Sequence, residues 1–160
     1  MPFREESCLS PNWSPQPAHE CLGVLFHHSV MGFEETIAFM QRVESQVSYH
    51  CLIAPDGTRC TLVPDHHLAW HAGASHFLGR TRCNDFLLGL AFAGDTYRSP
   101  LTPSQVASAL EWLAPRWRRH AWTLERMTDH RQVAPLRKND LNPVEWERLR
   151  ATLQAFFDPK

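Results

Sequence analysis

Apolar residues gather in three short runs that predict β-strands. Residues 23–29, GVLFHHS, end in polar groups and predict a buried strand that carries His27 and His28 at its carboxyl end. Residues 84–94, NDFLLGLAFAG, are almost continuously apolar and predict a central strand covered on both faces. Residues 49–64, YHCLIAPDGTRCTLVP, contain two β-rich runs around Asp56-Gly57, which is the pattern of a hairpin.

Three other stretches carry apolar residues at helical spacing. The segment 32–46 predicts a helix whose inward residues are Ile37, Met40 and Val43. Thr102-Pro103-Ser104-Gln105 supplies an N-cap, a proline at the first helical position and a glutamine that closes a capping box. The buried stripe of this helix is predicted to be Val106, Ala109, Leu110, Leu113 and Trp117. Asn142-Pro143-Val144-Glu145 repeats the helix start, before a stripe of Trp146, Leu149, Leu153 and Phe156.

Strands interspersed with helices predict the α/β class, a mixed central sheet flanked by helices in one domain. We expect this domain to span residues 21–160. Residues 1–20 are polar and rich in proline, and they predict an irregular N-terminal arm. The chain shows no internal repeat and no low-complexity tract.

Composition narrows the classes of function. The 160 residues are 43% apolar and 21% charged, and the net charge of −1 lacks the basic excess of a nucleic-acid-binding domain. Five cysteines without a C-x-x-C pair favour reduced thiols. No segment approaches the roughly 20 apolar residues of a membrane span, and no apolar signal region opens the chain. We therefore expect a cytoplasmic protein without membrane or nucleic-acid contacts, and nothing indicates a protein partner.

Candidate metal ligands come from the ten histidines and from the segment 129–140, DHRQVAPLRKND. A catalytic zinc site has three protein ligands and an open fourth position. His27 at a strand end, with His130 and Asp140 around a loop, would supply two imidazoles and a carboxylate. Spacing alone does not separate this set from a chance pairing among ten histidines.

Five ordered motifs give this set more weight. They are LFHHSV, VSYHCLIAPDG, LAWHAG, GRTRCNDF and HRQVAPLRKND. Together they resemble the zinc-dependent N-acetylmuramoyl-L-alanine amidases, in particular the AmpD-like cytoplasmic amidases of cell-wall recycling. Phage amidases and peptidoglycan recognition proteins are more distant relatives. The resemblance covers residues 21–156 and implies the amidase fold and peptidoglycan fragments or muropeptides as substrate.

The resemblance assigns roles to individual residues. It implies that Zn²⁺ is held by His27, His130 and Asp140, and that Lys138 is the catalytic lysine, a cation that stabilises the oxyanion. His28 is then expected to pack or to orient a neighbour. Tyr49 matches a tyrosine that contributes to catalysis in phage-type members, although a tyrosine packed on the sheet is the simpler interpretation.

Three further residues are candidates for substrate binding. Arg82 matches a family arginine that meets a carboxylate of the stem peptide, and a guanidinium suits this bidentate contact. A surface salt bridge is the alternative for Arg82. Asn84 would support it or cap a turn. His71 lies near the cleft by resemblance, or is a structural histidine that bonds to the backbone.

Ala91 departs from the family pattern. AmpD-like enzymes usually carry a glutamate at this position of the strand, and an alanine can neither accept a proton nor hold a water. Either the chain hydrolyses its substrate with Zn²⁺, Tyr49 and Lys138, as phage-type members do, or it binds peptidoglycan without cleaving it. The three ligands and Lys138 favour hydrolysis. A zinc hydrolase acting on another amide is a third hypothesis.

Overall fold

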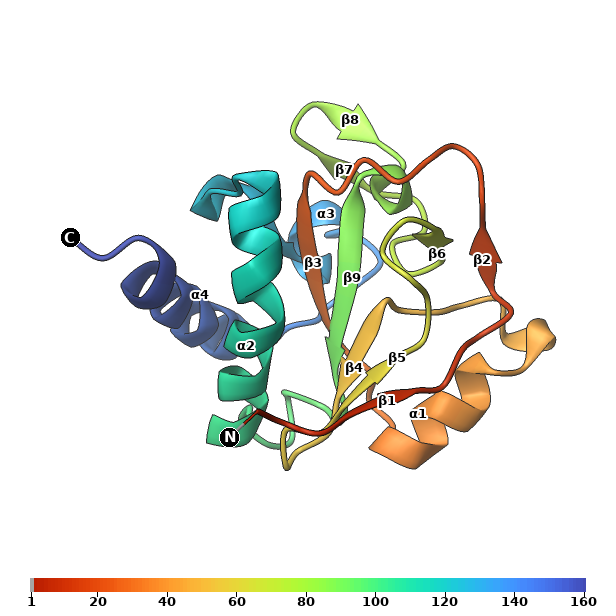
Figure 1. Cartoon of the computed structure of the whole chain (residues 1–160), viewed down its shortest axis with the longest axis horizontal. Coiled ribbons are helices and arrows are strands. Elements are labelled where there is room, and N and C mark those ends of the chain that lie inside the picture. The colour runs from red at the N-terminus through yellow and green to blue at the C-terminus, as the bar shows by residue number, and fades with distance from the viewer. Residues whose placement is uncertain (1) are drawn as a thin grey trace.

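The centre of the molecule is a mixed six-stranded sheet (Figure 1). The computed structural model describes residues 2–160. The strands follow the spatial order β1-β5-β4-β9-β3-β10. Their bounds are β1 Glu5–Ser7, β3 Gly23–His28, β4 Cys51–Ile53, β5 Arg59–Thr61, β9 Leu87–Phe92 and β10 Met127–Asp129. β4 and β5 run antiparallel, and the other neighbouring pairs run parallel. The α/β class predicted from the sequence is confirmed.

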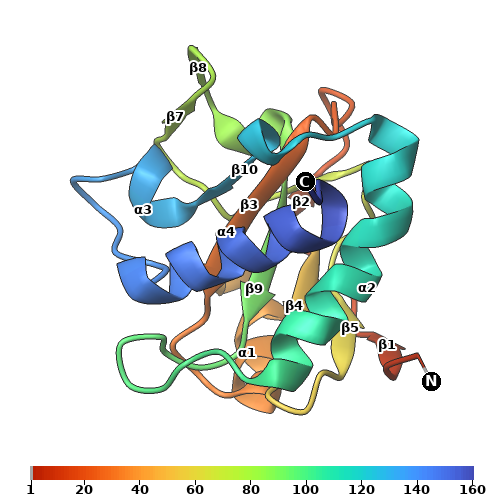
Figure 2. The same ribbon diagram turned by 90° about the vertical axis from the view of Figure 1, so that its left-hand side faces the viewer.

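Helices cover both faces of this sheet. The helices are α1 Phe33–Met40, α2 Pro103–His120, α3 His130–Val133 and α4 Pro143–Phe157, with 3-10 turns η1 Val43–Ser45, η2 Cys83–Asp85 and η3 Leu124–Arg126. Figure 2 shows α2 and α4 side by side on one face, and Figure 1 shows α1 on the opposite side. Within residues 2–160, every helix is too short or too polar to cross a lipid bilayer.

The predicted central strands β3 and β9 are confirmed. Every residue of both strands is buried, because α2 and α4 cover one face and α1 with its neighbouring loops covers the other. The predicted hairpin is also confirmed: β4 pairs with β5, and Gly57 takes a φ of 91° in the turn. An L-residue rarely adopts this φ, which explains the Asp-Gly dipeptide.

The N-terminal arm is more regular than the sequence predicts. β1 lies within it and forms the edge of the main sheet by pairing with β5. A second strand of the arm, β2 (Trp13–Ser14), pairs with β6 (Leu68–Ala69). The sequence did not predict these two strands, because short edge strands are stabilised by their partners and leave little apolar pattern of their own.

Two predicted core residues are exposed. Val43 is 60% exposed, because α1 ends at Met40 and Val43 falls in the following 3-10 turn. Phe156 is 55% exposed, and its neighbour Phe157 instead stacks on Trp117 with ring centroids 4.0 Å apart. The remaining buried stripe of α4 is confirmed, since Trp146, Leu149 and Leu153 all lie in the core.

The start of α2 contains the predicted capping box. The Thr102 hydroxyl accepts from the Gln105 backbone N–H, and the Gln105 side chain accepts from the Thr102 N–H at 3.0 Å. Thr102 also donates to the carbonyl of Pro55 at 2.5 Å, which ties the helix to the β4–β5 turn. The cap therefore links a helix to the sheet.

We predict that Thr102→Ala lowers the free energy of unfolding by about 1 kcal/mol, because the Gln105 N–H and the Pro55 carbonyl both lose the Thr102 hydroxyl as their hydrogen-bond partner. Thr102→Ser keeps the hydroxyl and serves as the matched control. Chemical denaturation of both variants measures the effect. Equal stability of the alanine variant and the unmodified chain would contradict this role.

Candidate metal centre

Two histidines meet at the carboxyl ends of β3 and β10. The parallel register pairs Asp129 with Phe26, so the next residues along the two strands are His130 and His27. Asp140 returns to the same point after α3 and a loop. Its Oδ2 lies 3.4 Å from Nδ1 of His27, and its Oδ1 lies 3.5 Å from Nδ1 of His130. One ligand atom from each of the three residues lies within 4.8 Å of the others, and all three residues are buried.

This donor set is typical of a zinc amidase site. Two imidazole nitrogens and one carboxylate oxygen match the ligand sets of zinc hydrolases, which leave a fourth position open. The Nε2 atoms point away from the cluster: that of His27 lies 2.9 Å from Nδ1 of His71, and that of His130 lies 2.9 Å from the carbonyl of Ala72. The Nδ1 atoms are therefore the ones available to a metal.

The charge states of these groups suit a cation. Burial lowers the pKa of His27 to about 4, although Asp140 opposes this shift, so the imidazole is neutral near pH 7. Burial by itself would raise the pKa of Asp140, but the neighbouring His130 and His27 hold it below its usual value. A neutral imidazole and an ionised carboxylate are the forms that bind a metal without first losing a proton.

Asp129 is a residue whose structural role the sequence did not reveal. Its buried carboxylate accepts from the backbone N–H of Gln132 and of Leu141, which follows Asp140. The N–H of Arg131 donates to the Asp140 carbonyl at 2.7 Å. These bonds hold the His130 turn and the Asp140 loop together. An aspartate directly before a helix start is the N-cap signal that marks it in the sequence.

The ligand cluster lies in a cleft of about 240 Å³ that Tyr49 and Lys138 also line. The half-buried ring of Tyr49 lies 4.9 Å from the His27 ring, centroid to centroid. Burial raises the pKa of Tyr49, so its hydroxyl stays protonated and can donate a hydrogen bond. Lys138 is exposed on the loop that leads to Asp140. The structure thus brings six predicted residues to one cleft: His27, His130, Asp140, Tyr49, Lys138 and His71.

The three predicted substrate contacts have different surroundings. His71 is buried behind His27, and burial holds its pKa well below the usual value. The Asn84 side chain accepts from the backbone N–H groups of His71 and Ala72. The Arg82 side chain is 75% exposed, bonds to Asp85 at 3.2 Å, and is absent from the residues that line the cleft. His71 and Asn84 are therefore placed to support the metal ligands from behind.

Ala91 lies on β9 directly beside His27. The two residues are register partners, and Ala91 is fully buried among Leu52, Met40 and other apolar side chains. Among the residues of the described chain, 2–160, that line the cleft, Asp140 is the only carboxylate. Within this described part of the chain, no second carboxyl group lines the cleft to exchange protons with a substrate.

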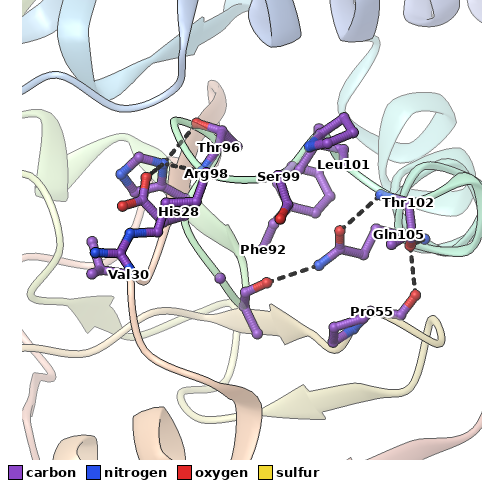
Figure 3. A pocket seen from close by; sticks show the side chains of 14 residues that line it. His28, Val30, Pro55, Phe92, Thr96, Arg98, Ser99, Leu101, Thr102 and Gln105 are labelled. Atoms are coloured by element: carbon purple, nitrogen blue, oxygen red, sulfur yellow. Dashed lines mark hydrogen bonds and ion pairs between the residues drawn. The ribbon is translucent and has the colours of Figure 1, made fainter.

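A larger cavity of about 400 Å³ adjoins the cleft on the far side of His28 and Val30 (Figure 3). Figure 3 shows Gln105 in its wall, where the carboxamide donates to the carbonyls of Ile53 and Ala93. His28 bonds to the Thr96 hydroxyl at 2.8 Å, as expected of a packing residue. The inner polar groups of this cavity are thus paired within the chain itself.

Known proteins share both the sequence pattern and the fold. The 1,6-anhydro-N-acetylmuramyl-L-alanine amidase AmpD of Salmonella typhimurium is 39% identical over 116 residues, which are 71% of this chain and 60% of that protein. The chain therefore spans about three fifths of this relative's length. A crystal structure of a selenomethionine AmpD derivative superposes with a TM-score of 0.73 at 28% identity and covers 93% of each chain.

A substrate complex is among the similar structures. The amidase AmiD from E. coli, solved with anhydro-N-acetylmuramic acid-L-Ala-D-gamma-Glu-L-Lys, superposes with a TM-score of 0.72 at 27% identity. The match covers 85% of this chain and 59% of that one. The family model of the N-acetylmuramoyl-L-alanine amidases matches residues 17–143 and thus includes both histidine ligands and Asp140. The chain belongs to the N-acetylmuramoyl-L-alanine amidase family.

Proposed function

We propose that this protein is a zinc-dependent amidase that hydrolyses the amide bond between N-acetylmuramic acid and L-alanine in peptidoglycan or anhydro-muropeptides. The observation that carries the proposal is the cluster of His27, His130 and Asp140, with Tyr49 and Lys138 in the same cleft. Family membership supports it, as does the muropeptide bound by the similar AmiD.

We assign the metal to His27, His130 and Asp140, where Zn²⁺ would polarise the amide carbonyl and make water acidic enough to attack near neutral pH. The ammonium of Lys138 stabilises the negative charge that develops on the carbonyl oxygen. The protonated hydroxyl of Tyr49 orients the carbonyl or the water by donating a hydrogen bond. Because Ala91 offers no carboxylate, the proton for the leaving amine comes from Tyr49, Lys138 or a water.

The physical form of the substrate has two candidates. Similarity to the anhydro-muropeptide amidases favours small soluble muropeptides, and a cytoplasmic location accords with that substrate. A site without the glutamate, as in phage-type members, favours the intact wall.

A second candidate function is peptidoglycan binding without cleavage. The observation in its favour is that Ala91, which has only a methyl group, lies beside His27.

We predict that chelation abolishes release of the peptide from soluble anhydro-muropeptide, and that added Zn²⁺ restores it. The reason is that the proposed mechanism needs the metal to make the attacking water acidic enough near neutral pH. Chromatography of the released peptide measures the rate, and a parallel assay on intact sacculi compares the two substrate forms. Hydrolysis that persists in the chelated protein would exclude the metal mechanism. Binding of muropeptide without any release, even with excess Zn²⁺, would favour the binding function instead.

Lys138→Ala is expected to lower kcat by about 100- to 1,000-fold, because the cation acts only on the charge of the transition state. Zinc affinity should stay the same, since Lys138 is not a ligand. The chain has one other lysine, Lys160, which is exposed near the C-terminus, and Lys160→Ala is the matched control. A variant of Lys138 that keeps full kcat would remove this residue from the mechanism.

Arg82→Ala is expected to raise KM for a muropeptide about tenfold with little change in kcat, if its guanidinium meets a stem-peptide carboxylate. Arg80→Ala is the matched control, because Arg80 lies on the same β7 (His76–Phe77) to β8 (Arg80–Thr81) hairpin and pairs with Glu20. Steady-state kinetics separate the two variants. Identical KM values would assign Arg82 to its salt bridge with Asp85 alone.

A further inference from the structure

A histidine that binds a metal through Nδ1 must keep its proton on Nε2. A hydrogen-bond acceptor at Nε2 selects this form and fixes the direction of the ring. His27 and His130 both offer Nδ1 to the cluster, so each needs such an acceptor. Both acceptors come from two consecutive residues, His71 and Ala72, in the loop 70–73.

The acceptor of His27 is itself fixed by the backbone. Nε2 of His71 lies 3.0 Å from the carbonyl of Leu87, and a carbonyl can only accept, so the His71 proton is on Nε2. Nδ1 of His71 is then an acceptor and receives the Nε2–H of His27 at 2.9 Å. This chain of bonds from β9 to the cluster leaves Nδ1 of His27 with a free lone pair.

The acceptor of His130 is a backbone carbonyl, so no second side chain has to fix its role. The carbonyl of Ala72 receives the Nε2–H of His130 at 2.9 Å, and all of these atoms are buried. Arg137 donates to the same carbonyl at 2.9 Å from the loop that leads to Lys138. The direction of both ligand rings therefore depends on how the consecutive residues His71 and Ala72 are held.

Asn84 holds the backbone of these two residues. Its Oδ1 accepts from the N–H of His71 at 3.1 Å and from the N–H of Ala72 at 2.8 Å. Asn84 belongs to η2, which leads directly into β9, so the loop 70–73 is bound to the sheet that also carries the Leu87 carbonyl. One side-chain oxygen thus positions the acceptors of two ligands.

Gly89 makes room for the His71 ring. A Cβ at this position would lie 2.7 Å from Cγ of His71 and 2.8 Å from its Nδ1, closer than real side chains approach. Gly32 is the contrasting position, because a Cβ there would meet nothing within 4 Å. The imidazole of His71 can therefore approach β9 this closely only because residue 89 lacks a side chain.

We propose that Asn84 and His71 are positioning residues for the metal rather than contacts for the substrate. Asn84 fixes the loop 70–73, and this loop fixes the Nε2-protonated forms of His27 and His130. The inference rests on the proposed metal site, and it adds that the affinity of this site is set by a residue that touches neither the metal nor the substrate.

The test is the dissociation constant of Zn²⁺ for the full chain, measured by competition with a chromophoric chelator. Asn84→Leu should weaken binding by about 10- to 100-fold, the usual effect of losing a partner of a metal ligand. Asn84→Asp keeps the acceptor oxygen and should restore affinity to within a few-fold. Gly89→Ala should weaken binding in the same range, whereas the matched control Gly32→Ala should not change it.

Nitrogen-15 NMR of the histidine rings in the zinc-loaded, unmutated protein tests the same idea without a substitution. We expect protonated Nε2 and unprotonated Nδ1 for both His27 and His130, and a proton on Nδ1 of either would overturn the proposal. Zinc affinity unchanged in Asn84→Leu and Gly89→Ala would overturn it as well. If the unmutated chain does not bind Zn²⁺ at all, the proposed function fails instead.

Discussion

The parallel pairing of β3 with β10 is the contact on which the metal centre depends. Its register sets Phe26 against Asp129, and so brings His27 beside His130 although 102 residues separate them in the chain. Side chains alternate between the two faces of a strand, so a slip of one residue would turn His27 to the opposite face. The full burial of β3 between helices on both sides prevents such a slip.

A buried cluster of two imidazoles and a carboxylate is costly unless each polar atom is paired. Hydrogen bonds from two parts of the chain offset this cost. The loop 70–73 accepts the Nε2 protons of the histidines, and Asp129 binds the backbone next to Asp140. The outward groups of the cluster are satisfied, and its inward lone pairs converge on one point. Within residues 2–160, Asp140 is the only carboxylate that lines the cleft, and Ala91 occupies the neighbouring position on β9.

Much of the fold could be predicted from local pattern. The strands around His27 and Ala91 are continuous apolar runs, and Thr102 and Asn142 cap helices as their sequences indicate. The apolar pattern did not predict the structure where contacts with another segment of the chain decide it. β1 is a strand because β5 lies beside it, and Val43 turns outward because α1 ends early. Edge strands and helix ends carry weak signals, since their stability comes from contacts that are distant in sequence.

The sequence by itself determined the family motifs, and with them the candidate ligands His27, His130 and Asp140 and the absence of a glutamate at Ala91. Tertiary structure alone decided what His71, Asn84 and Asp129 do. Their roles are hydrogen bonds to atoms brought close by the sheet register, such as the bond from His27 to His71 across 44 residues. The sequence states which side chain is present at each position. The partner of each hydrogen bond is decided only when the strands pair and bring distant residues together.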